Sequence, residues 1–258
     1  MEPIMTNALI LADLHLDLWH RAGLNPLDQI DFEGVELMII AGDLTNKPRV
    51  RWKQAFELIG ERIPLDRVHV LPGNHDYYDF RLDGDDRLAE IARTAGAKFA
   101  QKSVITYGST RYLCCTLWTD MRIGTGTLDE NAAEAARIMN DYRYIRVAHA
   151  GFRKARPLDT VGLHREHVAW LEARLSEPFA GETVVVTHHA PHPFALSPGG
   201  PVPQAYASDL SDLIKRYQPD RWLFGHTHLT TEFQIGTTKL RNVSVGYPAK
   251  AATKHGKL

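Results

Sequence analysis

Five short groups of polar residues along the chain carry side chains that bind metal ions. They are Asp13-x-His15, Gly42-Asp43, Gly73-Asn74-His75-Asp76, His188-His189 and Gly225-His226-x-His228. Carboxylates and imidazoles suit Mn, Fe, Zn or Co, and these groups lack the thiolates that close structural zinc sites. On extended backbone, two residues separated by one other point the same way, so each Asp-x-His or His-x-His pair can reach one ion. The motifs therefore predict a metal centre of the catalytic kind.

Each group follows an apolar run that has the character of a buried strand. The first four runs cover residues 8–12, 37–41, 68–71 and 183–186, and further strands are predicted at 221–224, 231–235 and 239–245. Apolar residues at helical spacing predict helices over 50–62, 87–95, 129–139, 164–175 and 208–217. Because strands and helices alternate, we expect an α/β fold with two packed sheets flanked by helices.

The composition limits the class of protein. The chain has 258 residues, and its hydrophobic content of 44% supports a packed core and excludes disordered and fibrous classes. The formal net charge of −1 gives no basic excess, so nucleic acid is not the obvious ligand. The only cysteines, Cys114 and Cys115, are adjacent in an apolar run whose alternating faces point the thiols apart, which excludes a disulfide or a CxxC pair.

We find no repeat and no flexible linker, so a single domain over residues 1–258 is predicted. The stretch 119–162 is the least regular and is predicted to be a substrate-facing insertion. No apolar stretch approaches 18 residues and no secretory leader is recognised, so we expect a cytoplasmic location without membrane contact. His164 and His167, three residues apart on a predicted helix, are interpreted as surface residues.

The order of the motifs, from Asp13 to His228, resembles the calcineurin-like metallophosphoesterases, and in particular their small bacterial phosphodiesterase-like branch. The resemblance implies a four-layered αββα sandwich of two mixed β-sheets flanked by helices. It also implies two divalent or trivalent metal ions, Mn, Fe or Zn, bridged by Asp43. One ion would be held by Asp13, His15, Asp43 and His228, and the other by Asp43, Asn74, His188 and His226.

The same resemblance implies a mechanism. A hydroxide that bridges the two ions would be the nucleophile, because two cations lower the pKa of bound water. His75 would be the general acid that protonates the leaving-group oxygen, or would stabilise charge on the phosphoryl group. Asp76 would orient the imidazole of His75.

Four further residues are predicted to lie at the substrate. The His188-His189 pair leaves the register of the ligand open; His188 follows the predicted strand most directly and is taken as the ligand, with His189 supporting it or facing the substrate. Tyr77 and Tyr78 follow the third motif directly, and they either contact the substrate or pack the loop. His192 lies four residues beyond the predicted ligand His188, close enough for a substrate contact.

These features predict a phosphodiesterase that acts on a small phosphorylated molecule. Residues 42–48 lack the Gly-Asp-x-x-Asp-Arg-Gly motif of Ser/Thr protein phosphatases, which disfavours a phosphoprotein phosphatase. A phosphomonoesterase, a nuclease and a non-catalytic metal-binding interaction module are the alternatives. A basic strip that includes Lys47, Arg49, Arg51 and Lys53 keeps the nuclease open, whereas the complete set of ligand residues argues against the interaction module. The oligomeric state is left unassigned.

Overall fold

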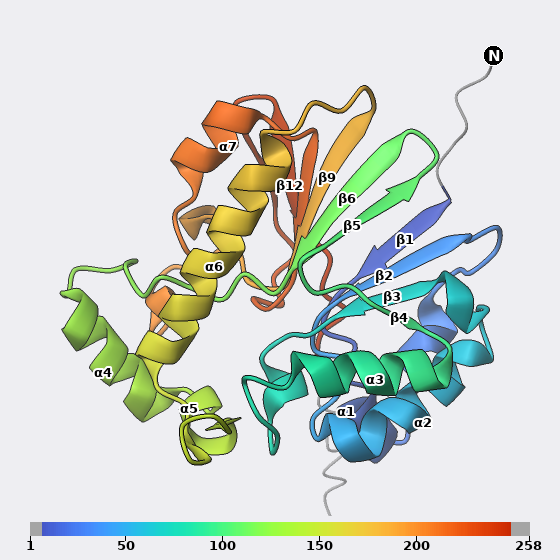
Figure 1. The fold of residues 1–258 in the computed structure, drawn as a ribbon, viewed down its shortest axis with the longest axis horizontal. Helices are drawn as coiled ribbons and strands as arrows, with labels where there is room; N and C mark the ends of the chain where they lie inside the picture. The colour runs from blue at the N-terminus through green and yellow to red at the C-terminus, as the bar shows by residue number, and fades with distance from the viewer. Residues whose placement is uncertain (1–6, 249–258) are drawn as a thin grey trace, which may run out of the picture.

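The first sheet is built from the N-terminal part of the chain, where strands and helices alternate. The computed structural model describes residues 7–248. The four strands of this sheet are parallel and lie in sequence order: β1 (Ala8–Leu11), β2 (Leu37–Ala41), β3 (Val68–Leu71) and β4 (Lys98–Phe99). The α-helices between them are α1 (Leu16–Arg21), α2 (Pro48–Gly60) and α3 (Asp85–Ala95). Helices α2 and α3 cover the outer face of this sheet (Figure 1).

The second sheet has six strands in the order β11-β12-β10-β9-β6-β5. These are β5 (Ser103–Tyr107), β6 (Thr110–Cys115), β9 (Glu182–Thr187), β10 (Arg221–Phe224), β11 (Glu232–Ile235) and β12 (Thr238–Asn242). The β5-β6 and β11-β12 pairs are antiparallel and the others are parallel. Helices α6 (Pro157–Leu175) and α7 (Ser211–Tyr217) lie on the outer side of this sheet (Figure 1). Short 3-10 helices occur at η1 (Pro26–Gln29), η2 (Leu65–Arg67), η3 (His75–Tyr77), η4 (Pro193–Ala195) and η5 (Pro203–Ala205).

Alternating side chains of the central strands face two different cores. In β2, Ile40 packs in the cluster that contains Trp52 of α2, whereas Ile39 faces the second sheet in a cluster with Val184 of β9. In β6, Cys114 lies in this core between the sheets and Cys115 lies on the helix side, both buried and unpaired. Because successive side chains of a strand point to opposite faces of the sheet, each of these strands contributes to the core between the sheets and to the core under the helices. The predicted αββα sandwich is confirmed, with one sheet wholly parallel and the other mixed.

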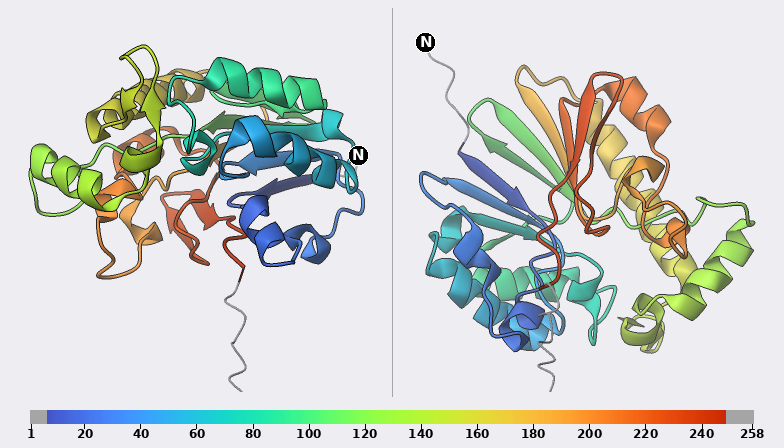
Figure 2. Two further views of the ribbon diagram at one scale, coloured as in Figure 1. Left: turned by 90° about the horizontal axis from the view of Figure 1, so that it is seen from below. Right: turned by 180° about the vertical axis from the view of Figure 1, so that it is seen from behind.

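The stretch 119–162 contains secondary structure of its own. It holds α4 (Leu128–Ile138), α5 (Asp141–Tyr144), the hairpin of β7 (Arg146–Val147) and β8 (Arg153–Lys154), and the first turns of α6. Figures 1 and 2 show α4 and α5 projecting beyond the sheets at one end of the sandwich. Its role as a substrate-facing insertion stays a prediction.

Helix α6 begins earlier than predicted, and its two histidines are not surface residues. His164 and His167 are 5% and 2% exposed. The Nδ1 of His164 lies 3.1 Å from the carbonyl oxygen of Leu117, and the backbone N–H of Leu117 donates to Nδ1 of His167 at 3.1 Å. Leu117 and Trp118 have φ values of 74° and 56°, so the two rings fix a strained backbone just after β6. Within residues 7–248, α6 and every other helix is too short or too polar to cross a bilayer.

Candidate metal centre

The loops that follow five parallel strands meet where the two sheets adjoin. The first three motifs lie after β1, β2 and β3 of the first sheet, and the last two lie after β9 and β10 of the second. A parallel bridge between Ala12 and Ser244 joins the chain ends of β1 and β12 beside Asp13. In open α/β sheets, ligands bind at the carboxyl ends of the strands. The topology therefore brings Asp13 and His228 into contact although they lie 215 positions apart.

One cluster contains Asp13, His15, Asp43 and His228, whose ligand atoms all lie within 4.8 Å of one another. The Nε2 of His228 is 2.9 Å from Oδ1 of Asp13. The Nε2 of His15 is 3.3 Å from Nε2 of His228 and 3.5 Å from Oδ2 of Asp43. Three motifs thus bring four ligand atoms close enough together for one ion to be chelated.

A second cluster contains Asp43, His188 and His226, again within 4.8 Å. The Nε2 of His188 is 3.5 Å from Oδ1 of Asp43 and 3.0 Å from Oδ1 of Asn74. The Nε2 of His226 is buried and has no hydrogen-bond partner among the described residues. Asp43 directs Oδ2 to the first cluster and Oδ1 to the second, so its carboxylate stands between them.

Contacts behind the ligand atoms fix their orientation. The Nδ1 of His188 is 2.9 Å from the carbonyl oxygen of Ala41, to which it donates, so Nε2 is left to face Asp43. The amide nitrogen of Asn74 donates to Oδ1 of Asp141 at 2.8 Å, which turns the amide oxygen of Asn74 towards His188. Supporting hydrogen bonds of this kind orient the ligands of metal sites.

The backbone at these motifs is strained. Five predicted ligands have φ between 39° and 66°, a region that residues other than glycine rarely adopt. They are Asp13, His15, Asp43, His226 and His228. Two motif glycines permit close approach: a Cβ on Gly73 would lie 2.2 Å from Oδ1 of Asp43, and a Cβ on Gly225 would lie 2.4 Å from Oδ2 of Asp13. The loops therefore accept an unfavourable backbone conformation that positions the Asp and His side chains of the two clusters.

The charges of the two clusters fit metal ions. Burial raises the pKa of Asp43 well above its usual value, and the carboxylate of Asp13 adds to this effect. Burial acts in the same direction on Asp13, but the hydrogen bond with His228 and the neighbouring imidazoles outweigh it and lower the pKa of Asp13. Burial lowers the pKa of His15 and His226 well below the usual value, so both rings are neutral at pH 7. The neutral imidazoles do not balance the negative charge of the two close, buried carboxylates. Bound cations would neutralise that charge.

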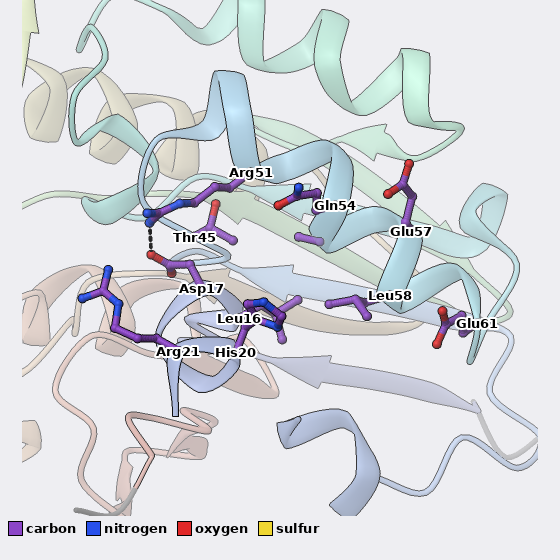
Figure 3. Close-up of a pocket in the computed structure, with 11 residues that line it drawn as sticks. Leu16, Asp17, His20, Arg21, Thr45, Arg51, Gln54, Glu57, Leu58 and Glu61 are labelled. Atoms are coloured by element: carbon purple, nitrogen blue, oxygen red, sulfur yellow. Dashed lines mark hydrogen bonds and ion pairs between the residues drawn. The ribbon is translucent and has the colours of Figure 1, made fainter. Parts of the chain in front are cut away.

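His75 lies beside the first cluster and is held by Asn46. Its ring centroid is 4.8 Å from that of His15, and its Nδ1 is 2.8 Å from Oδ1 of Asn46. The Asn46 amide nitrogen donates to Asp17 at 3.2 Å, so the amide oxygen accepts from Nδ1 of His75. Arg51 pairs with the same carboxylate of Asp17 at the edge of a pocket of about 550 Å³ (Figure 3). This pocket, between α1 and α2, contains no predicted metal ligand.

Asp76 does not orient His75, contrary to the prediction. Its carboxylate is fully buried and accepts four hydrogen bonds, from the backbone N–H groups of Leu44, Thr45 and Gly73 and from Nε1 of Trp52. Burial raises the pKa of Asp76 to about 6, although these hydrogen bonds act in the opposite direction. In the 3-10 turn of η3, adjacent side chains point different ways, so Asp76 fastens the Asp43 loop to the Asn74 loop instead.

The two predicted substrate tyrosines lie in different surroundings. Tyr78 stacks on the ring of His75, with centroids 4.3 Å apart, and its hydroxyl donates to Asp141 at 2.6 Å. Tyr77 is 1% exposed, and its hydroxyl donates to Asp85 at 2.6 Å. Tyr77 therefore packs the loop, whereas Tyr78 borders the candidate centre.

His188, and not His189, lies in the cluster that could hold the second metal ion. His189 is 1% exposed, its Nδ1 is 3.2 Å from the carbonyl oxygen of Thr116, and its ring lies 4.2 Å from that of His226. This position favours support of His226 over contact with a substrate. His192 caps η4 by accepting from Phe194 N–H, and its ring contacts Phe233.

Four residues at the centre were not predicted from the sequence. Asn46 holds His75, and Asp141 holds Asn74. The ring of Tyr206 lies 5.0 Å from that of His226, and Tyr247, which is 51% exposed, lies 4.5 Å from both His15 and His228. Only Asn46 carried a local signal, because it follows Asp43 by three residues in the same loop. The others reach the centre from distant parts of the chain.

Comparisons with known proteins find relatives of this chain and structures that share its fold. A protein of Acanthamoeba polyphaga mimivirus described as uncharacterized is 22% identical over 263 residues, which cover 92% of this chain and 90% of that protein. Phosphopantetheinyl hydrolase from Mycobacterium tuberculosis shares the fold with a TM-score of 0.70 and 20% identity, over 93% of this chain and 89% of that one. A putative 5'-nucleotidase from Staphylococcus aureus aligns with a TM-score of 0.52 and 10% identity, over 91% of this chain and 48% of that one.

The family model described as calcineurin-like phosphoesterase matches residues 6–229. This span takes in every motif from Asp13 to His228, and those motifs form two buried Asp/His clusters that meet at Asp43. The chain therefore belongs to the calcineurin-like metallophosphoesterases, a family of metal-dependent phosphoesterases.

Proposed function

We propose that this protein is a phosphodiesterase that acts on a small phosphorylated molecule at a centre of two metal ions. Asp13, His15 and His228 would hold one ion, Asn74, His188 and His226 the other, with Asp43 between them. The observation that carries the proposal is the division of the Asp43 oxygens between two clusters next to His75.

Two ions held in this way supply Lewis-acid activation of the phosphoryl group and of the attacking water. His75 supplies the proton for the leaving group. Burial lowers the pKa of His75 to about 3, and its Nδ1 proton is donated to Asn46, so the neutral ring presents Nε2 as an acceptor. A phosphodiester anion beside the ring adds negative charge, which favours the imidazolium. Nε2 takes up a proton from solvent to form the imidazolium, donates that proton to the leaving-group oxygen, and leaves the ring neutral again.

The preference for a diester rests on the side chains around the clusters. Tyr78 stacks on His75, Tyr206 lies against His226, and Tyr247 lies over His15. A diester carries one charge and two organic substituents, whereas a monoester carries up to two charges and one substituent. Neutral, aromatic surroundings therefore suit the diester better.

The test is hydrolysis of bis-p-nitrophenyl phosphate beside p-nitrophenyl phosphate. The protein is chelated and then reloaded with Mn, Fe, Co, Ni or Zn, and it is compared with Asp43→Asn and with Asp129→Asn, a matched change at an exposed position of α4. We expect metal-dependent turnover of the diester that falls at least about 100-fold in Asp43→Asn and is unchanged in Asp129→Asn. Equal turnover in Asp43→Asn would contradict the proposal.

Other outcomes would select an alternative. Faster hydrolysis of the monoester would indicate a phosphomonoesterase, and metal binding without turnover of any phosphoester would indicate an interaction module. Tight binding of nucleic acid that falls steeply with salt would indicate a nuclease. A protein that carries a phosphopantetheinyl group is a useful additional substrate, because a phosphopantetheinyl hydrolase shares the fold.

A further inference from the structure

A pocket of about 700 Å³ between the predicted insertion and helices α2 and α3 is lined by five arginines. They are Arg49, Arg81, Arg87, Arg143 and Arg146. The chain as a whole carries a net charge of −1, so this is a local concentration of positive charge and not a property of the entire surface. We call it the arginine pocket.

Three of the five guanidinium groups have no carboxylate partner. Arg81 pairs with Asp86 at 2.6 Å, and Arg87 pairs with Glu90. In the described part of the chain, Arg49, Arg143 and Arg146 form no ion pair, although the guanidinium group of Arg143 donates to the carbonyl oxygen of Arg137 at 2.9 Å and to Oδ1 of Asn140 at 3.4 Å. The one acidic residue in the lining, Asp79, pairs with Lys47 at 3.4 Å. The arginine pocket therefore keeps an excess of positive charge that an anionic ligand can neutralise.

Backbone hydrogen bonds hold the walls of the pocket in place. The N–H of Asp79 donates to the carbonyl of Tyr144 at 3.1 Å. The N–H of Leu82 donates to the carbonyl of Arg146 at 2.7 Å, and the N–H of Arg146 donates to the carbonyl of Phe80 at 3.1 Å. These bonds join the segment after η3 to Tyr144 and Arg146, so the backbone that carries Arg81 and Arg146 is held in place before a ligand binds.

Two tyrosine rings, Tyr144 and Tyr78, lie between the arginine pocket and His75 at the candidate metal centre. Tyr144 lines the pocket, and its ring centroid is 5.6 Å from that of Tyr78, which stacks on His75. Tyr144 and Phe152 are 47% and 65% exposed, so two aromatic rings at this pocket are open to a ligand. A guanidinium group can bind phosphate and an exposed aromatic ring can stack, so the two kinds of side chain together suit a ligand that has an anionic and an aromatic part.

We propose that the arginine pocket binds the polyphosphate group of a small molecule, with an aromatic ring of that molecule against Tyr144 and Phe152. A guanidinium group binds phosphate through two parallel N–H donors, and several such groups around one pocket can neutralise much of the charge of a polyphosphate. The volume of about 700 Å³ suits a small ligand, whereas an extended polyanion would need a longer basic surface. A nucleoside diphosphate has both required parts.

The proposal is tested by calorimetric binding of ADP, pyrophosphate and inorganic phosphate to the full chain, both after loading with Zn or Mn and after chelation. The first variant is Arg143→Gln/Arg146→Gln. The second is Arg49→Gln, which comes from α2 and so does not depend on the fold of the insertion. The matched control is Arg174→Gln/Arg216→Gln, two arginines on α6 and α7 that pair with Glu177 and Glu172.

We expect ADP to bind the double variant at least tenfold more weakly than the unchanged protein, and the control with unchanged affinity. Binding should persist after chelation, because the arginine pocket contains no predicted metal ligand; a failed metal centre would thus leave this result intact. Equal affinity of both arginine variants and the unchanged protein would overturn the proposal. Binding of single-stranded oligonucleotide in preference to ADP would overturn it in favour of a nucleic-acid surface.

Discussion

His75 depends on a neighbour from another loop and not on the next residue in the chain. The sequence Gly-Asn-His-Asp suggests a histidine oriented by the adjacent carboxylate, but Asp76 is fully engaged with backbone N–H groups and Trp52. Asn46 takes the orienting role, and Asp17 fixes its amide. A carboxylate in contact with His75 would raise its pKa, whereas a neutral amide orients the ring without adding charge.

Substitution of Asn46 is expected to slow the chemical step. In Asn46→Ala the Nδ1 of His75 loses its acceptor, so the ring rotates and Nε2 is misplaced for proton transfer. We expect kcat for the diester to fall by about 10- to 100-fold with little change in KM. Metal content, measured by mass spectrometry, should stay the same. Asn25→Ala, which removes a side chain that caps η1, serves as the matched control. An unchanged kcat in Asn46→Ala would contradict the assignment.

At the scale of elements, α5 connects the predicted insertion to the metal centre. Asp141, at the start of α5, is 2% exposed and accepts from both Asn74 and Tyr78 through Oδ1. The orientation of a predicted ligand on the β3 loop is thus fixed by a helix that lies outside the two sheets. This contact would give the predicted insertion a part in building the predicted metal centre.

Removal of the Asp141 charge is expected to weaken metal binding. In Asp141→Asn the new amide can present a nitrogen to Asn74, which turns the Asn74 oxygen away from His188. Loss of such a supporting contact reduces metal affinity by about 10- to 100-fold. Titration of the chelated protein with Zn or Mn should show weaker binding of one of two ions, with Asp129→Asn as control. Two ions bound as tightly as in the unchanged protein would refute this role.

Protonation of His167 in α6 is expected to couple the stability of the protein to pH. Burial, and secondarily Lys102, lowers the pKa of His167 from 6.5 to about 4. The unfolded chain binds a proton at this residue at a higher pH than the native protein, so stability falls as the pH drops from 6.5 towards 4. The shift corresponds to at most about 3 kcal/mol of the free energy of unfolding. Neutral His167 accepts from the Leu117 N–H, which protonation prevents.

The prediction is checked by urea unfolding at several values between pH 7 and pH 4.5. The unchanged protein should lose stability more steeply than His167→Gln over this range, because the variant lacks the titrating ring. His20→Gln, at an exposed position of α1, should keep the slope of the unchanged protein. Parallel slopes for His167→Gln and the unchanged protein would show that His167 does not carry the effect.

At the scale of the whole molecule, the sequence predicted what is local and missed what depends on packing between distant segments. Strand ends that lead directly into polar motifs placed the ligands at one edge of each sheet, and the clusters form there. Strand β5 and the early start of α6 carry weaker periodicity and were not predicted. Asp141 and Tyr247 reach the centre only because the insertion and the segment after β12 pack against the β1 and β3 loops. No pattern in their own neighbourhood indicates those contacts.

We propose that two ions lie at the strand ends where the two sheets adjoin, with Asp43 shared between them. The decisive experiment is anomalous scattering from crystals of the protein loaded with Zn or Mn. We predict two peaks in each chain, one among Asp13, His15 and His228 and one among Asn74, His188 and His226, with Asp43 between them. A single peak, or peaks outside these two clusters, in crystals of fully loaded protein would contradict the claim.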